Sequence, residues 1–575
     1  MSLSQLTLSL FGGRRGRNLR EYVTAYLMIA PAILLIFVFG IFPVGFALYV
    51  SLHKWVIVRS DFVGLENYVD AVGNFTYIVL FGMGVGGIAG AFLLARRIFR
   101  DAQLERRPEA WFLAIPAALH ATATLAFFRW VFFQLPEFLD IASKLRGLDR
   151  TRELFMRLLW EAFRAETVYP YWQQFTLVLL AATGAGLVAA LLWRSADNPA
   201  YQFRFTLAWL ALAVGAGLLY SLYRAVGDAY ATAVETGVDP GIWPQLISVV
   251  SGVLLLVVAW SVWRSAAGQD TTRSFVLRLL GGLVLMVGAV LLIIEIPTLV
   301  AAGDQDLWDG LKVTVFFSLG TIPFQLGIAL VLAFLLFQRL KGSDLFRVLF
   351  FLPYVTPAVA SATVFRLLFS ERQQAPVNTV LKWFGIGPQL WLREPDGIFS
   401  MLAETAGISG FPDAFIPRWF PADLSSLLAN WLTGPSMALV VILALSVWTF
   451  VGYNTVIYLA GLGNIPTETT EAAEMDGASQ WGVFRHITFP LLSPTTYFLS
   501  LVGVMGTFKA FNTIWVLRVG QALGTTDTFS VVIFEEFFQK SRYGYASALA
   551  FVLFGIILAL TYFNSKIQGS RVFYG

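Results

Sequence analysis

The 575-residue sequence contains no cysteine, which excludes disulfide frameworks, thiolate metal sites and cysteine nucleophiles. Its only histidines, His53, His120 and His486, are far apart in the chain, so a histidine metal cluster is not expected. No GxxxxGK followed by Ser or Thr is present to hold nucleotide phosphates. The sequence therefore offers no catalytic residues, no metal ligands and no nucleotide site of its own.

Charge is also scarce, at 13% of residues, whereas 57% are hydrophobic and 15% aromatic. The mean hydropathy of +0.70 exceeds what a water-soluble domain needs, so the chain is expected to fold in a bilayer. The net charge of +4 comes from basic clusters beside apolar runs, a membrane pattern that does not indicate nucleic acid. The apolar run at 23–50 is longer than the roughly 7 to 15 residues of a signal peptide, so it is expected to be a retained first span.

Apolar stretches of roughly 20 residues predict about twelve transmembrane helices and an all-α, polytopic fold. They are expected near 24–50, 77–97, 111–134, 174–193, 204–224, 242–263, 276–301, 311–338, 346–369, 436–461, 491–516 and 546–565. Arg and Lys gather in the even-numbered connections, whereas 225–241 and 302–310 contain acids and neither Arg nor Lys. The positive-inside rule then places both termini in the cytoplasm.

Some polar and small residues stand apart from this pattern. Segment 135–173 mixes bases and acids with an amphipathic stretch, which predicts an interfacial helix that covers the bundle or docks a partner. Arg129 and Glu295 lie toward span ends and are read as structural, whereas Lys509 lies deeper and is a functional hypothesis. The glycines at 82, 86 and 90 predict close helix packing.

The most informative connection is 461–494, which reads GLGNIPTETTEAAEMDGASQWGVFRHITFPLLSP. Pro466 suits the first turn of a helix, and Glu468 and Glu471 lie near the positive end of its dipole. Gly477 is expected to end this helix of about ten residues, because glycine accepts the left-handed conformation of a C-cap.

A second short helix is expected to follow. Ser479 can cap it, it runs through Phe484 and Ile487, and Pro490 is expected to end it before the next span. From these residues alone, the helix pair could lie on the bilayer or project into the cytoplasm toward a partner.

This pattern resembles the EAA loop of binding-protein-dependent ABC importer permeases of the maltose-type carbohydrate uptake family. In that family the loop is the coupling helix, which sits in a cleft of the ATPase subunit. The resemblance implies ATPase-coupling roles for Glu471, Ala472, Ala473, Met475, Asp476, Gly477, Ala478, Phe484, Ile487 and Pro490.

Other segments resemble the same family. They are FVGLENY at 62–68, the run at 345–369, GYNTVIYLAGLGNIP before the loop, and GTFKAFNTIWVL and YGYASALAF after it. In ordinary members the second helix follows FVGLENY almost directly, whereas here residues 69–306 intervene. Six spans in 77–301 would return the chain to the same side. The expected regions are 1–75 with the first span, an inserted membrane region at 76–305, and a type I permease core at 306–570.

The resemblance implies an ATP-driven importer of a sugar or oligosaccharide. It implies a second permease subunit, two copies of an ABC ATPase that bind ATP and magnesium, an extracytoplasmic solute-binding protein, and a bacterial inner-membrane location. A permease for a non-sugar solute such as glycerol phosphate remains open. An ion-coupled carrier would show two related halves, and a membrane enzyme would show clustered histidines or carboxylates. The substrate-path candidates are Trp448, Tyr453, Asn454, Tyr497, Ser500, Thr507 and Asn512.

Overall fold

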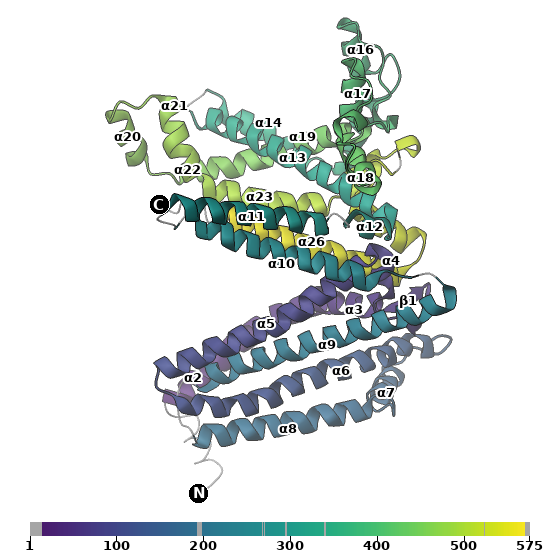
Figure 1. The fold of residues 1–575 in the computed structure, drawn as a ribbon, viewed down its shortest axis with the longest axis vertical. Coiled ribbons are helices and arrows are strands. Elements are labelled where there is room, and N and C mark those ends of the chain that lie inside the picture. The colour runs from purple at the N-terminus through teal and green to yellow at the C-terminus, as the bar shows by residue number, and fades with distance from the viewer. Residues whose placement is uncertain are drawn as a thin grey trace. The chain divides into compact units, whose positions relative to one another are not determined.

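The computed structural model describes residues 14–192, 198–237, 239–266, 268, 271–293, 296–338, 341–522 and 524–569. Within them the regular secondary structure is helix apart from one short hairpin (Figure 1). The chain forms two compact units, one of Met1–Gly73 with Ile296–Gly575 and one of Asn74–Glu295.

The first unit begins with a span made of α2 (Arg14–Ile36), the π-turn η1 (Phe37–Ile41) and α3 (Phe42–Ser51). The hairpin of β1 (His53–Val56) and β2 (Val58–Phe62) and the short α4 (Glu66–Val72) follow. The rest of this unit consists of α12 (Ile296–Ala301), α13 (Gln305–Phe337), α14 (Ser343–Val355), α15 (Ala358–Leu368), α16 (Pro376–Trp383), η3 (Trp391–Arg393), α17 (Ile398–Thr405), η4 (Asp413–Phe415), α18 (Ala422–Leu432), α19 (Met437–Gly463), α20 (Thr467–Met475), α21 (Gln480–Val483), η5 (Phe484–Thr488), α22 (Phe489–Leu491), α23 (Ser493–Phe508), α24 (Asn512–Leu517), η6 (Gly520–Ala522), α25 (Phe529–Phe534), η7 (Glu535–Gln539) and α26 (Tyr543–Gly569).

The second unit consists of α5 (Phe75–Leu104), η2 (Pro108–Leu113), α6 (Ala114–Lys144), α7 (Arg152–Phe163), α8 (Tyr169–Leu192), α9 (Asn198–Thr236), α10 (Ile242–Ala266) and α11 (Thr272–Ile293). In it, α5 packs along α9, α6 packs against α8 and α9, and α10 packs along α11. The expected amphipathic helix is α7, on which Phe155, Met156 and Trp160 are exposed.

Across the described ranges, ten helices are long and apolar enough to cross a membrane, and two bent helix pairs raise the number to twelve. The prediction of about twelve membrane helices is therefore confirmed. Two of the expected spans are not straight helices, however. The span at 346–369 bends by 94° between α14 and α15, and the helix preceding α23 meets it at 58°.

Proline explains both bends. Thr356 is extended, with ψ 134, because the ring of Pro357 disfavours a helical conformation in the residue before it. Similarly, Pro494 lies in the first turn of α23, where a missing N–H is tolerated, and the bend falls just ahead of it. The predicted span 491–516 is also too long, since α23 ends at Phe508 and α24 is a separate helix.

Helices α13, α19 and α23 form the centre of the first unit. Gly452 of α19 lies against the backbone of α14, so that a Cβ there would collide with the carbonyl oxygen of Phe350. In the second unit, α5 and α9 meet at Gly84, Gly87 and Gly215. The glycines at 82, 86 and 90 have no atom near the position of a Cβ, so the prediction that they form the packing face was wrong. The face of α5 that meets α9 carries Gly84 and Gly87 instead.

Of the charged residues predicted to lie within spans, those that the structure describes are found at a helix end or beside an aromatic ring. The guanidinium of Arg129 lies 4.8 Å from the ring centroid of Tyr171, which supports a structural role. Lys509 caps the end of α23 and is exposed, so it lies at a helix end rather than deep in a span. Glu295 lies outside the described residues.

Candidate functional site

The connection from α19 to α23 folds as two short helical arms joined at a glycine, and we call residues 467–491 the lever (Figure 1). The first arm, α20, starts directly after Pro466 and ends at Met475. Gly477 has φ +82, the left-handed conformation that favours glycine. Ser479 accepts a hydrogen bond at its Oγ from the backbone N–H of Gly482, at 3.2 Å. The predicted first helix, glycine turn and serine cap are thus confirmed.

The second arm differs from the prediction at Pro490. The helix continues past this residue to Leu491 instead of ending before it. A π-turn at Phe484–Thr488 precedes the proline and widens the helix, so that the N–H of Phe489 bonds to the carbonyl of Phe484. The wider turn leaves room for a ring that an α-helical interior would reject.

The tip of the lever is exposed to its surroundings. Helix α20 contains no buried residue, and Met475 is 88% exposed. Trp481, at the start of the second arm, is 67% exposed. The first arm and its cap also carry Glu468, Glu471 and further acids, all without a basic residue on that arm. The tip therefore presents apolar and acidic side chains together to its surroundings.

The base of the lever is fixed by aromatic contacts. The ring of Phe484 stacks on Trp481, with centroids 5.4 Å apart, and meets Phe334 of α13 edge-on at 4.8 Å. Of the predicted coupling residues, Phe484 and Ile487 are half-buried here, whereas Glu471, Ala472, Asp476, Gly477 and Ala478 are exposed. Phe334 was not foreseen, because its contact depends on the packing of a distant helix.

A buried cluster continues this base into the bundle. Tyr458, Leu462 and Leu492 pack with Ala329, Ala333 and Leu499 of α13 and α23. The hydroxyl of Tyr458 donates to Thr496 Oγ1 at 3.2 Å. The base of the lever is therefore packed against α13, α19 and α23 together.

The substrate-path candidates do not form one site. Trp448 and Tyr453 belong to a half-exposed aromatic surface on α19, where Tyr453 stacks on Tyr354 at 4.6 Å and Trp448 lies 5.6 Å from Phe365. This surface includes both sides of the bend between α14 and α15.

The remaining candidates lie elsewhere. Asn454, Ser500 and Thr507 are buried, and Thr507 Oγ1 donates to Ser318 Oγ of α13 at 3.0 Å. Tyr497 is half-buried, and its carbonyl accepts a hydrogen bond from the Ser500 hydroxyl at 2.8 Å. Asn512 is exposed at the first residue of α24. These positions are therefore helix packing or separate surfaces within this chain.

At the opposite end of α19 from the lever, a polar cavity of about 210 Å³ was missed in the sequence. Its lining includes Lys312 of α13, Asp396, Asn430 of α18, and Ser436. The ammonium of Lys312 donates to Asn430 Oδ1 at 2.7 Å. No local signal could have joined two residues so far apart in sequence.

An ionic network occupies the segment between α24 and α26. Arg518 pairs with Glu535 at 2.6 Å, and the buried carboxylate of Glu536 contacts Lys540 at 2.7 Å and also Arg542. Burial raises the pKa of Asp527, which lies 3.6 Å from Arg518. The network ties the segment before α26 in place.

The family model described as binding-protein-dependent transport system inner membrane component matches residues 325–568. The probable ABC transporter permease protein YesP of Bacillus subtilis is 31% identical over 275 residues, covering 47% of this chain and 75% of that protein. The arabinooligosaccharides transport system permease protein AraP of the same organism is 28% identical over 266 residues, covering 46% and 71%. The sn-glycerol-3-phosphate transport system permease protein UgpA of Agrobacterium fabrum is 30% identical over 274 residues, covering 47% and 79%.

Proposed function

The chain belongs to the family of binding-protein-dependent transport system inner membrane components, and from this premise we propose that it is the permease subunit of an ATP-driven importer for a sugar or oligosaccharide. It is a multi-pass membrane protein that carries the path for the solute and leaves ATP hydrolysis to a separate subunit. The observation that carries the proposal is the lever, with its exposed tip and its base packed into three helices of the bundle.

In this mechanism the ATPase subunit holds the tip of the lever and moves it when nucleotide is bound or hydrolysed. Phe484 and the cluster around Leu492 pass the movement to α13, α19 and α23. The acids of α20 suit a cleft that offers opposite charge. The ATPase subunit binds ATP and magnesium. The proposed coupling residues are the ten EAA-loop residues from Glu471 to Pro490 named in the sequence analysis.

The solute class is proposed from two supports. The half-exposed rings of Trp448 and Tyr453 offer flat apolar faces, and small-molecule sites are lined mostly by apolar and aromatic side chains. Among the relatives, AraP is named for arabinooligosaccharide transport. A second candidate is a glycerol phosphate, which the name of UgpA favours.

The proposed assembly contains a second permease subunit against the half-exposed aromatic surface. Two ATPase subunits bind the levers of the two permeases, and a solute-binding protein binds on the extracytoplasmic side of the membrane. The orientation that follows puts the lever and both termini in the cytoplasm. Arg and Lys in the connections on that side support it.

The coupling proposal is tested in vesicles that contain the chain, its partner permease and the ATPase, with solute-binding protein added outside. Glu471→Lys and Gly477→Arg should abolish uptake and the stimulation of ATPase activity by loaded binding protein, while insertion stays normal. The control is Glu404→Lys, which reverses another exposed glutamate, in the last turn of α17. Uptake at the parent rate in Gly477→Arg would refute the coupling role.

The solute is tested in the same vesicles by measuring ATPase stimulation with binding protein loaded with oligosaccharide or with glycerol phosphate. Trp448→Ala and Tyr453→Ala should lower oligosaccharide uptake while Thr183→Ala, an exposed position of α8, leaves it unchanged. Stimulation by glycerol phosphate alone would favour the second candidate.

A further inference from the structure

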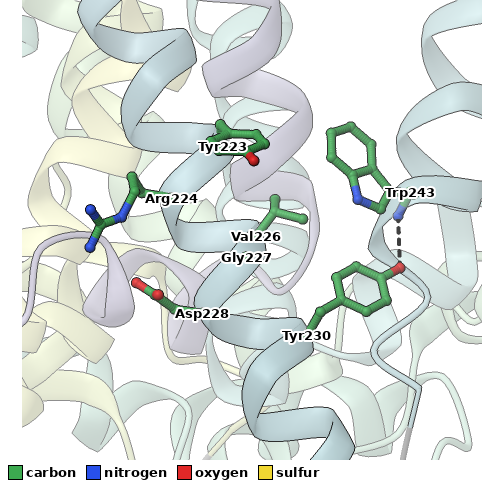
Figure 2. A pocket seen from close by; sticks show the side chains of 7 residues that line it. All are labelled: Tyr223, Arg224, Val226, Gly227, Asp228, Tyr230 and Trp243. Atoms are coloured by element: carbon green, nitrogen blue, oxygen red, sulfur yellow. Dashed lines mark hydrogen bonds between the residues drawn. The ribbon is translucent and has the colours of Figure 1, made fainter.

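A groove in the second unit has features that helix packing does not require. It has a volume of about 340 Å³ and is lined by six residues of α9 between Tyr223 and Tyr230 and by Trp243 of α10 (Figure 2). Arg224 and Asp228 lie on one side, and Tyr230 and Trp243 on the other. Gly227 leaves the helix backbone open between them, because it has no side chain and nothing fills the place of a Cβ.

The groove lies at the end of the membrane helices rather than at their centre. Gly215 of α9 meets Gly84 of α5, and α5 begins nine positions earlier in the chain, at Phe75. The side-chain amide of Asn74 donates to the carbonyl of Pro240, at 2.9 Å, just before α10 starts. Residues 223–230 are therefore level with the helix ends, where tyrosine and tryptophan meet the lipid head groups.

The two charges in the groove are one helical turn apart. In the part of the chain that the structure describes, Arg224 and Asp228 form no ion pair with each other or with a neighbour, and both are exposed. Interfacial anchoring explains the rings. It leaves the exposed guanidinium and the exposed carboxylate beside the groove available to a ligand.

We propose that this groove binds the head group of a zwitterionic aminophospholipid, with a phosphoethanolamine group as its ligand. Guanidinium binds phosphate oxygens through paired N–H donors, so Arg224 takes the phosphate. The ammonium then lies against the Asp228 carboxylate, and the rings on the other side of the groove pack against the apolar part of the head group. A cavity of this volume is at the small end of ligand sites and suits a head group.

This ligand fits the position better than a free solute does. The groove opens at head-group level, so a lipid reaches it along the bilayer without crossing water. A purely anionic lipid would satisfy Arg224 but leave the Asp228 carboxylate beside its negative charge. The proposal concerns the second unit alone and stands whether or not the transport function is correct.

The test uses the full chain, purified in mild detergent, stripped of lipid and titrated with phosphatidylethanolamine or phosphatidylglycerol of matched acyl chains. Native mass spectrometry counts the lipids that remain bound. Phosphatidylethanolamine should be retained at least about tenfold better, and Asp228→Asn should remove that preference by deleting one charge–charge contact. Arg224→Gln should weaken retention of both lipids.

Two matched controls separate the groove from the general lipid surface. Glu235→Gln removes another exposed carboxylate of α9, and Arg157→Gln removes an exposed guanidinium of α7; neither residue lines the groove. Both controls should retain phosphatidylethanolamine like the parent. Equal retention of the two lipids by the parent, or an unchanged preference in Asp228→Asn, would overturn the proposal. The unfolding temperature of Asp228→Asn should equal that of the parent, because this side chain is exposed.

Discussion

Replacing Gly477 with alanine isolates the contribution of one backbone conformation to the lever. The residue has φ +82, and an added Cβ would meet nothing within 4 Å. The substitution therefore introduces no collision, and its whole effect comes from the left-handed backbone. That conformation costs an L-residue roughly 1–2 kcal/mol, which lowers the population of the turn by at most about 5- to 30-fold.

The turn sets the angle between α20 and the second arm. In the proposed coupling role, a less populated turn therefore means a tip that is less often competent to dock. A ligand's apparent affinity falls by the fraction of competent protein. Gly477→Ala should therefore weaken binding of the ATPase subunit by up to about 30-fold, and the ATPase concentration that gives half-maximal uptake should rise in the same proportion. Surface binding measurements with detergent-solubilised permease, together with uptake in vesicles, give both values.

Two further variants identify the cause. Gly477→Asn should recover most of the lost affinity, because asparagine tolerates the left-handed region better than alanine does. Gly463→Ala is the matched control: this glycine at the end of α19 also has open space around it, but its backbone lies outside the left-handed region. Equal affinities for the parent, Gly477→Ala and Gly463→Ala would refute the reasoning, since the turn would then carry no part of docking.

Three other perturbations have defined outcomes. Gly452→Ala should destabilise the bundle by at least about 1–3 kcal/mol, because its Cβ collides with the Phe350 carbonyl, whereas Gly506→Ala meets open space and should be tolerated; unfolding temperatures compare the two. Phe484→Leu should reduce uptake more than Trp481→Leu, because only Phe484 contacts Phe334, in an aromatic pair worth about 0.5–1.5 kcal/mol. Burial raises the pKa of Asp527, so the folded state holds its proton at a higher pH than the unfolded chain does, and stability falls as pH rises from 3.8 through the folded-state pKa. Asp527→Asn should flatten that decline in unfolding temperature measured from acidic to neutral pH, and an unchanged slope would show that another group causes it.

The lever could be predicted closely because its signals are local. Gly477 and Ser479 each act on residues within one turn, so their conformations follow from the sequence around them. Pro490 was misread for the opposite reason: whether a proline ends a helix depends on the turn before it, and the π-turn at Phe484–Thr488 has no sequence marker.

The solute path could not be predicted in the same way. Helix α19 is apolar on nearly every side, so its sequence does not reveal which face packs and which stays open. Trp448 and Tyr453 prove to lie on the half-exposed face, while Asn454, the next residue, is buried. The hydrogen bond from Lys312 to Asn430 likewise depends on how α18 returns to α13, a long-range property that no window of sequence contains.

The number of membrane helices in the second unit agrees with an independent observation, a hydrogen bond in the first unit between the residues where the chain leaves and returns. Within the described residues, six helices of the second unit, from α5 to α11 without the short α7, are long and apolar enough to cross a membrane. An even number of crossings brings a chain back to the side from which it left. The first unit requires the same result, because the N–H of Asp304 bonds to the carbonyl of Ala71 at 3.0 Å, directly beside the exit at Gly73. A Cβ on Gly303 would lie 2.9 Å from that same carbonyl, so the exit and the return are held in close contact. An odd number of crossings would leave Gly73 and Asp304 on opposite sides of the membrane, where that hydrogen bond could not form.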